Sequence, residues 1–139
     1  MLFRSGLTVG GAAYASDNEV AYCWTAIPGF SAFGSYTGNG SADGPFVYTG
    51  FRPRYVLTKR TDSIGSWFIT DTSRTLYNAS TTNILFPDSS IAEDTVDPSV
   101  DILSNGFKLR ATGAGSNASG GTYIYAAFAE NPFKMSRAR

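Results

Sequence analysis

Short segments in which apolar and polar residues alternate, separated by glycine-rich turns, constrain the fold of this chain more than any other feature. Residues 34–44 are punctuated by glycine and asparagine, and residues 51–60 and 66–71 follow as two segments typical of strands. Alternation with a period of two places successive side chains on opposite faces of a sheet. No window has the 3.6-residue period of an amphipathic helix. The pattern predicts a rigid all-β scaffold that displays polar loops.

Two pairs of the expected strands should form antiparallel hairpins. Outside one long polar region, the composition and alternation predict strands at residues 20–25, 30–37, 46–49, 55–60, 66–70, 100–103, 107–110 and 122–129. Residues 62–65 form a loop of hairpin length, so 66–70 should pair with 55–60. The Asn105-Gly106 turn predicts a second hairpin. Residues 72–98, rich in polar side chains, are expected to be long loops holding one or two short strands.

We therefore expect an antiparallel two-sheet β-sandwich of jelly-roll or lectin-like character. Aromatic residues make up 14% of the chain, which is enough to fill the space between two sheets. Tyr55, Trp67 and Tyr123 lie in strong strand patterns and are expected in the core. The single cysteine, Cys23, is expected to be a small buried apolar side chain rather than a reactive thiol.

The length of 139 residues predicts one domain, preceded by a segment with its own strand. When Pro28 is aligned with Pro132, Trp24 falls on Phe128, which suggests an internal echo between the two ends of the chain. On this interpretation residues 1–29 are an N-terminal strand segment and residues 30–139 form the β-sandwich domain. The N-terminal strand would either complete or cap the sheet of this domain or pair with a neighbouring subunit.

The charge balance excludes several classes of partner. Eleven basic residues balance eleven acidic ones, so no net field attracts nucleic acid or an anionic membrane. No apolar run approaches the roughly 20 residues that a membrane-spanning helix needs. Histidine is absent, which removes the commonest proton shuttle and metal ligand. We expect no nucleic acid partner, no membrane insertion, no cofactor and no metal.

Candidate catalytic and metal-binding carboxylates are more simply explained as loop residues. Glycan cleavage needs two carboxyl groups across a cleft, and Asp62 with Asp71, or Glu93 with Asp94, are the available pairs. Each is better explained as a turn residue or a solvated charge, so we expect no enzyme activity. A calcium site would have to use the acidic residues of the polar region, whose spacing matches no EF-hand: Asp88, Glu93, Asp94 and Asp97. Three asparagines in glycosylation-type triplets are expected to serve turns: Asn39, Asn78 and Asn117.

The residues that could bind a sugar combine aromatic rings with planar polar groups. An aromatic face stacks on a pyranose ring while amide and guanidinium groups bind its hydroxyls. Arg74, Tyr77 and Asn78 lie together in the polar region, and Tyr48 with Arg52 and Arg54 forms a second group: these six are the candidate ligand-binding residues.

A set of short motifs resembles a repeat near the C-terminal ends of bacteriophage tail-fibre and virion-associated proteins. The motifs are fairly specific in combination and cover nearly the whole chain from about residue 19: residues 36–40 (YTGNG), 50–53 (GFRP), 56–60 (VLTKR), Trp67 with Asp71, 105–107 (NGF) and 121–133 (GTYIYAAFAENPF). The resemblance implies β-sandwich modules arranged in tandem and a role in a virus particle. It brings no defined catalytic or ligand site.

These observations together predict a non-enzymatic virion protein whose loops, above all residues 72–98, contact a glycan on the bacterial host. The alternative from a different class is a capsid decoration or cement protein that binds other virion subunits. A glycan depolymerase is a third hypothesis. Because fibre tips and decoration proteins associate symmetrically, we expect a homotrimer.

Overall fold

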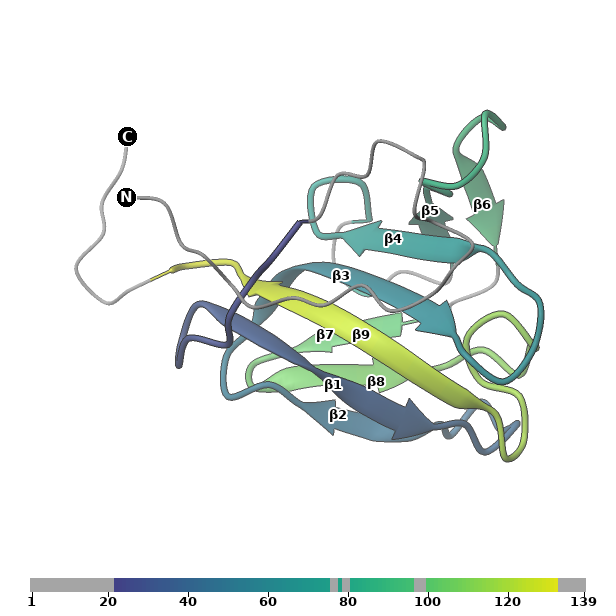
Figure 1. The fold of residues 1–139 in the computed structure, drawn as a ribbon, viewed down its shortest axis with the longest axis horizontal. Coiled ribbons are helices and arrows are strands. Elements are labelled where there is room, and N and C mark those ends of the chain that lie inside the picture. Colours follow the sequence, from purple (N-terminus) through teal and green to yellow (C-terminus); the bar gives the residue numbers. More distant parts are fainter. Residues whose placement is uncertain (1–21, 76–77, 79–80, 97–99, 133–139) are drawn as a thin grey trace, which may run out of the picture.

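The computed structural model describes residues 22–75, 78, 81–96 and 100–132, and these residues form an antiparallel β-sandwich (Figure 1). Two sheets face each other, and no helix occurs among the described residues. Consequently none of them belongs to a helix long and apolar enough to span a membrane. The prediction of an all-β, two-sheet antiparallel architecture is confirmed.

The larger sheet has four strands in the order β1-β9-β3-β4: β1 (Ser31–Thr37), β9 (Thr122–Ala129), β3 (Pro53–Arg60) and β4 (Trp67–Asp71). The last long strand, β9, therefore lies in the middle, between β1 and β3. The expected hairpin between β3 and β4 is present, with Leu57 opposite Ile69. A register shift at Pro53/Tyr55 leaves Arg54 outside the β3–β9 ladder.

The second sheet has three strands in the order β2-β8-β7: β2 (Phe46–Tyr48), β8 (Gly106–Leu109) and β7 (Val100–Leu103). The predicted Asn-Gly hairpin connects β7 to β8. The polar region contains the expected short strands, β5 (Thr82–Ile84) and β6 (Asp94–Val96), paired with each other. A bridge between Ile69 and Leu85 attaches this hairpin to the free edge of β4 and protects it from pairing with another chain.

Aromatic and aliphatic side chains fill the space between the sheets. The rings of Tyr36 and Tyr123 are stacked with their centroids 5.0 Å apart, and the edge of Phe107 meets the rings of Tyr36 and Tyr125. Phe107 and Tyr123 are fully buried, and each such side chain stabilises the fold by roughly 1.5–3 kcal/mol. The expected core position of Tyr123 is thus confirmed.

The outer face of the four-stranded sheet is apolar as well, which explains two wrong predictions. In β3, Val56 and Thr58 point into the sandwich, so the alternating Tyr55 and Leu57 point outward. Trp67 also lies on this outer face and remains partly exposed. Alternation identified the two faces of these strands but not which face is covered, and Tyr55 and Trp67 are not core residues.

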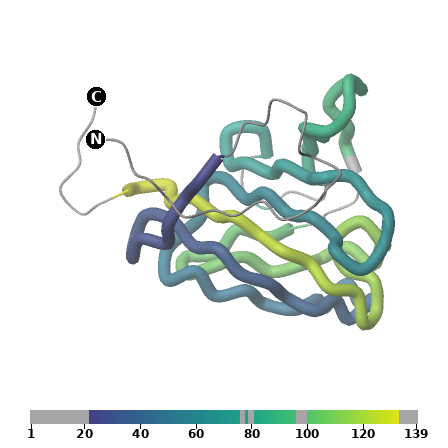
Figure 2. The backbone as a smooth tube through the Cα atoms, in the orientation of Figure 1, coloured from purple at the N-terminus to yellow at the C-terminus, as the bar shows by residue number. Residues whose placement is uncertain are grey.

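Residues 22–26 cross this outer face instead of adding a strand to it (Figure 2). Residues 22–26 have no strand structure, so the strand expected at 20–25 is wrong where it is described. The chain reverses at Gly29, whose φ is +75°, and a bridge from Ile27 to Ser31 closes a tight turn. This turn directs the preceding residues out of the plane of the sheet. Cys23 is exposed, contrary to the prediction, while Trp24 lines two grooves on the outer face.

Candidate functional site

Five of the six predicted ligand-binding residues lie at one end of the sandwich, drawn on the left in Figure 1. We call this region the loop end, and it comprises residues 48–54, 71–75, 78, 103–106 and 130. Tyr77, the sixth predicted residue, lies outside the described residues. Backbone hydrogen bonds join these connections: the N–H of Thr72 donates to Arg54, and that of Glu130 to Arg52. The fold therefore unites two groups of residues that are separate in sequence.

Arg74 is held by two carboxylates at the loop end. Its Nε lies 2.7 Å from Asp71 Oδ2 and its Nη1 lies 2.6 Å from Glu93 Oε2. Hydrogen bonds with Glu93 and then Asp71 raise the pKa of the guanidinium above its usual value. Because Glu93 belongs to the connection between β5 and β6, Arg74 fastens that hairpin to the end of β4. A ligand would have to compete with both partners for this side chain.

Arg52 and Asn78 converge on the backbone of one residue, Ile102. Asn78 Nδ2 donates to the Ile102 carbonyl at 3.0 Å, and the Ile102 N–H donates to Asn78 Oδ1 at 2.7 Å. Arg52 donates to the same carbonyl and forms an ion pair with Glu130 at 2.9 Å. Asn78 has a φ of +46°, a conformation that asparagine tolerates well. The Asn78 side chain thus bonds to β7, which is distant in the sequence, and the neighbouring residues 76–77 and 79–80 lie outside the described residues, so the prediction that Asn78 serves a turn stays a prediction.

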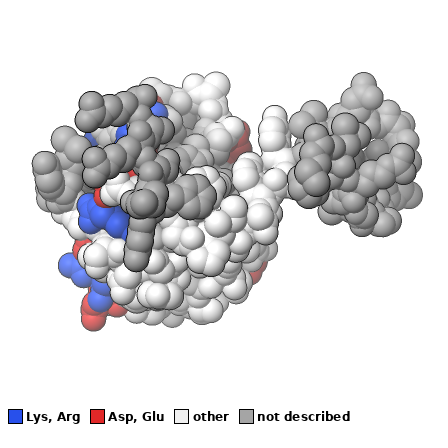
Figure 3. All heavy atoms as spheres, turned by 90° about the vertical axis from the view of Figure 1, so that its left-hand side faces the viewer, with Lys and Arg blue, Asp and Glu red and all other residues white. Residues whose placement is uncertain are grey.

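Tyr48 and Arg54 are the loop-end candidates with the fewest bonds to the protein. Tyr48 lies at the end of β2 and is 67% exposed. Arg54 is exposed and donates to the hydroxyl of Ser73 at 2.7 Å, and none of the six ion pairs found among the described residues involves it. Figure 3 looks onto this end of the molecule, where the visible Lys and Arg side chains gather on one side, next to acidic ones. The loop end is a polar surface rather than a pocket.

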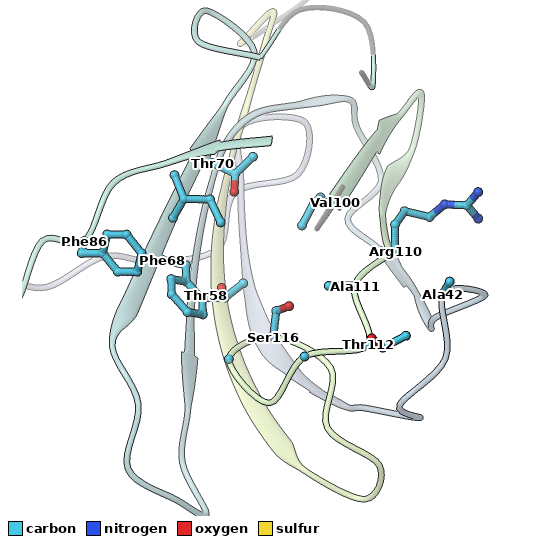
Figure 4. A pocket seen from close by; sticks show the side chains of 13 residues that line it. Ala42, Thr58, Phe68, Thr70, Phe86, Val100, Arg110, Ala111, Thr112 and Ser116 are labelled. Atoms are coloured by element: carbon cyan, nitrogen blue, oxygen red, sulfur yellow. The ribbon is translucent and has the colours of Figure 1, made fainter. Parts of the chain in front are cut away.

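A cleft of about 600 Å³ lies elsewhere, between the two sheets on the side of β4 and β7 (Figure 4). One wall comes from β3, β4 and Phe86, and the other from Val100 and the segment 110–116. The rings of Phe68 and Phe86 meet edge to face with their centroids 5.3 Å apart. A Cβ on Gly115 would lie 2.5 Å from the Phe68 ring, so glycine lets the loop approach this closely. None of the six predicted ligand-binding residues lines the cleft. Its lining residues are Ala42, Thr58, Phe68, Thr70, Ile84, Phe86, Val100, 110–113, Gly115 and Ser116.

Three buried hydroxyl groups line this cleft. Thr58 and Thr70 are each 5% exposed, and Ser116 is 7% exposed. Among the described residues, none of the three hydroxyls has a hydrogen-bond partner in the protein. Buried polar groups are nearly always paired, so these hydroxyls have bonding capacity to offer to a molecule in the cleft. Figure 4 shows the side chain of Arg110 directed away from Phe68 and Thr58, and Arg110 forms an ion pair with Asp101 instead.

Two core tyrosines position the loop that forms one wall of the cleft. The Tyr36 hydroxyl donates to the Ser116 carbonyl at 2.9 Å, and the Tyr123 hydroxyl donates to the Ala114 carbonyl at 2.7 Å. The N–H of Ala118 donates back to the Tyr123 hydroxyl at 2.8 Å. Burial, reinforced by Tyr123, raises the pKa of Tyr36 far above its usual value. The hydrophobic core therefore fixes the geometry of the cleft directly.

Asn117 ties the same loop to its neighbours. Its side chain is fully buried, accepts a hydrogen bond from the Asn39 N–H at 2.8 Å, and donates to Asn39 Oδ1. Nδ2 also lies 2.8 Å from the carbonyl oxygens of Ser41 and Ala111, so its two hydrogens are shared among three acceptors. Two of the three predicted turn asparagines thus bind each other, and they hold the β1–β2 and β8–β9 connections together next to the cleft.

The carboxylates of the two candidate pairs are engaged in separate contacts within the protein. Asp62 pairs with Arg60 in the connection before β4, whereas Asp71 lies at the far end of β4. Glu93 is bonded to Arg74 and to Asn83, and Asp94 pairs with Ile84 across the hairpin. Asp88 accepts the N–H of Trp67, and Asp97 lies outside the described residues. The described part of the chain contains no cluster of metal-ligating side chains.

Comparison with known proteins identifies a family. The model of a domain of unknown function, DUF7483, matches residues 3–132. The chain belongs to the DUF7483 family. Neither the curated proteins nor the solved structures contain a match. The DUF7483 match therefore spans both the sandwich and most of the segment before it.

One signal in the sequence points to the cleft of this DUF7483 domain. In β3 and β4 the inward positions are Val56, Thr58, Phe68 and Thr70, so a threonine interrupts the apolar face of each strand. A polar residue at an inward position needs a hydrogen-bonding partner. The sequence alone does not show which of the two alternating sets of residues in each strand faces inward. For that reason the cleft could not be predicted.

Proposed function

We propose that this domain is a bacteriophage virion module of the tail-fibre type that attaches to a glycan on the bacterial host surface. The observation that carries the proposal is the loop end, where the fold gathers Tyr48, Arg52, Arg54, Arg74 and Asn78 on one rigid surface. Aromatic and planar polar groups of this kind suit an extended polar ligand bound with modest affinity. The resemblance of the sequence motifs to tail-fibre repeats supports the same role.

Deletion of residues 72–98 is a poor test, although the sequence favours it as the contact region. This region includes the buried side chains of Thr82 and Ile84 and the bridge from Leu85 to Ile69. Removing it would expose the edge of β4 and disturb the sandwich itself. Substitutions of exposed side chains separate binding from folding more cleanly.

The proposal is tested by binding of the fluorescently labelled domain to cells of the host strain. The variant Tyr48→Ser/Arg54→Ser/Arg74→Ser removes three exposed loop-end groups. We expect it to bind the cells at least ten times more weakly, which corresponds to a loss of about 1.4 kcal/mol in binding free energy. Ile64→Ser, at a fully exposed position in the connection at the other end, is the matched control and should bind like the wild type. Periodate oxidation of the cells should abolish binding. Equal binding by the wild type and the triple variant would overturn the proposal.

A capsid decoration or cement protein is the second candidate, favoured by the apolar outer face of the four-stranded sheet. Ile124 is 40% exposed there and Trp24 is 63% exposed. Exposed apolar patches of this kind mark protein–protein contacts. Electron microscopy of the particle separates the two functions, because a decoration protein occupies many sites on the shell and a fibre module occupies few sites at the tail. In either case the partners are other virion proteins and further copies of this chain, for which we propose a trimer.

A further inference from the structure

We propose that the cleft between the two sheets binds one neutral saccharide unit of pyranose size. The cleft lies away from the loop end, so this proposal is separate from host attachment through the loop-end residues. Its volume of about 600 Å³ lies within the range of roughly 300–1,000 Å³ that is usual for small-molecule sites. A single sugar ring with bound water fits such a space.

The three hydroxyls without a partner among the described residues require a ligand that offers hydrogen-bonding groups. Thr58 and Thr70 come from adjacent strands of one sheet, and Ser116 comes from the loop beside them. A hydroxyl can both donate and accept, and so can each hydroxyl of a sugar. The hydroxyls of a sugar in the cleft can therefore serve as partners for these groups, whichever way each hydrogen bond runs.

The aromatic wall of the cleft requires a ligand that also has an apolar face. Phe68 and Phe86 line one side of the cleft, and Val100 lies on the other. The C–H face of a pyranose ring packs against such apolar surfaces, while its hydroxyls project from the rim of the ring. A purely hydrocarbon ligand would leave the three buried hydroxyls unpaired, which is unfavourable.

The charges around the cleft favour a neutral ligand. Arg110 is the one charged residue among the described residues that line it, and its side chain points outward to Asp101, 3.2 Å away. An anionic group inside the cleft would therefore find no free cation among these lining residues, and burial of an unpaired charge is unfavourable. These features together select a saccharide over a lipid chain or a phosphate.

Titration of the isotopically labelled domain with methyl glycosides of glucose, galactose and N-acetylglucosamine tests the proposal by NMR. We expect at least one glycoside at millimolar concentration to shift the amide signals of Thr58, Thr70 and Ser116 in a saturable manner. Cyclohexanol, a ring of similar size with a single hydroxyl, should bind more weakly. If no glycoside shifts these signals, or if cyclohexanol binds at least as well, the cleft is a hydrated gap in the packing and the proposal is wrong.

The variant Thr70→Val separates binding from stability. It removes one hydroxyl at constant shape, so we expect an affinity about tenfold lower with a thermal midpoint equal to or above that of the wild type. Thr70→Ser keeps the hydroxyl and should retain most of the affinity. Thr49→Val is the matched control, because the Thr49 hydroxyl donates to the Phe51 carbonyl at the loop end; it should lower the midpoint without changing the affinity. Unchanged affinity in Thr70→Val, or a clear loss of its stability, would contradict the assigned role of the hydroxyl.

The two proposals can fail separately. Glycoside titration reports on the cleft, whereas the cell-binding variants substitute loop-end residues, none of which lines the cleft. Loss of cell binding in the triple variant with an intact glycoside response would place two sugar-binding surfaces on one domain. If the domain responds to a glycoside but does not bind cells, sugar binding in the cleft is supported and attachment through the loop end is overturned.

Discussion

At the loop end, polar side chains bind one another, whereas in the cleft three hydroxyl groups face a space in which the described part of the protein offers them no partner. Arg74 and Arg52 are each held by carboxylates, and Asn78 is held by the backbone of Ile102. Thr70 and Ser116, by contrast, are buried without such bonds among the described residues. The abundance of polar residues on a surface is thus a poor guide to the bonding capacity that remains for a ligand.

The difference follows from how each region is stabilised. The loop end rests on exposed ion pairs, which individually contribute little. The wall of the cleft rests on the buried side chains of Tyr36, Tyr123 and Asn117, which connect it to the core. The cleft should therefore be the more rigid of the two, and the following predictions test this comparison.

The largest effect is expected for Asn117→Ala. The substitution removes four side-chain hydrogen bonds from a fully buried position and should lower the free energy of unfolding by about 3 kcal/mol, since each buried bond contributes about 1 kcal/mol and the stranded groups add to the loss. Urea denaturation measures this change. A loss below about 1 kcal/mol would show that the loops beside the cleft do not depend on this residue.

The second-largest effect is expected at alkaline pH, where the free energy of unfolding should fall. The pKa of Tyr36 is raised in the folded protein, so above pH 10 the unfolded chain loses a proton that the folded chain keeps. Stability therefore falls as the pH rises above 10, by up to about 1.4 kcal/mol per pH unit for this group. In Tyr36→Phe the slope of unfolding free energy against pH should be shallower, although Tyr55 and Tyr125, whose pKa values are also raised by burial, still contribute. Identical slopes for the two proteins would contradict the burial of the phenol.

Asn78→Ala is the matched substitution at the loop end. Asn78 makes two hydrogen bonds to Ile102 from an exposed position, so we expect a loss of about 1 kcal/mol, smaller than that of Asn117→Ala. The ratio of the two losses, measured under the same denaturation conditions, compares the two regions directly. Equal losses would remove the distinction between a buried and an exposed asparagine network.

The smallest effect is expected for Arg74→Ala. Its two ion pairs are partly exposed, and ion pairs in contact with solvent contribute little because water and salt screen them. Thermal denaturation at low and high salt should show a small loss of stability that diminishes as salt screens the charges. A loss as large as that of Asn117→Ala would mean that the attachment of the β5–β6 hairpin depends on Arg74 far more than its exposure indicates.

Local patterns predicted the elements well because each depends on neighbours in sequence. The hairpin at Asn105-Gly106 and the strand at residues 122–129 occur as expected, since turn chemistry and alternation act over a few residues. The same patterns misplaced Cys23, Tyr55 and Trp67, because burial depends on what covers each face. For the candidate site, the sequence indicated loop-end residues by type but could not show that Arg74 and Asn78 are already bonded within the protein.

By itself, the sequence of this protein determined an all-β chain, its hairpins and the asparagines and glycines of its turns, because alternation and turn geometry are local. Only the tertiary structure decided that β9 lies between β1 and β3, which face of each strand is covered, and that Thr58, Thr70 and Ser116 meet in one cleft. The physical reason is that a hydroxyl group becomes a potential binding group through its surroundings. Burial and the absence of a protein partner arise only when segments distant in the sequence pack together.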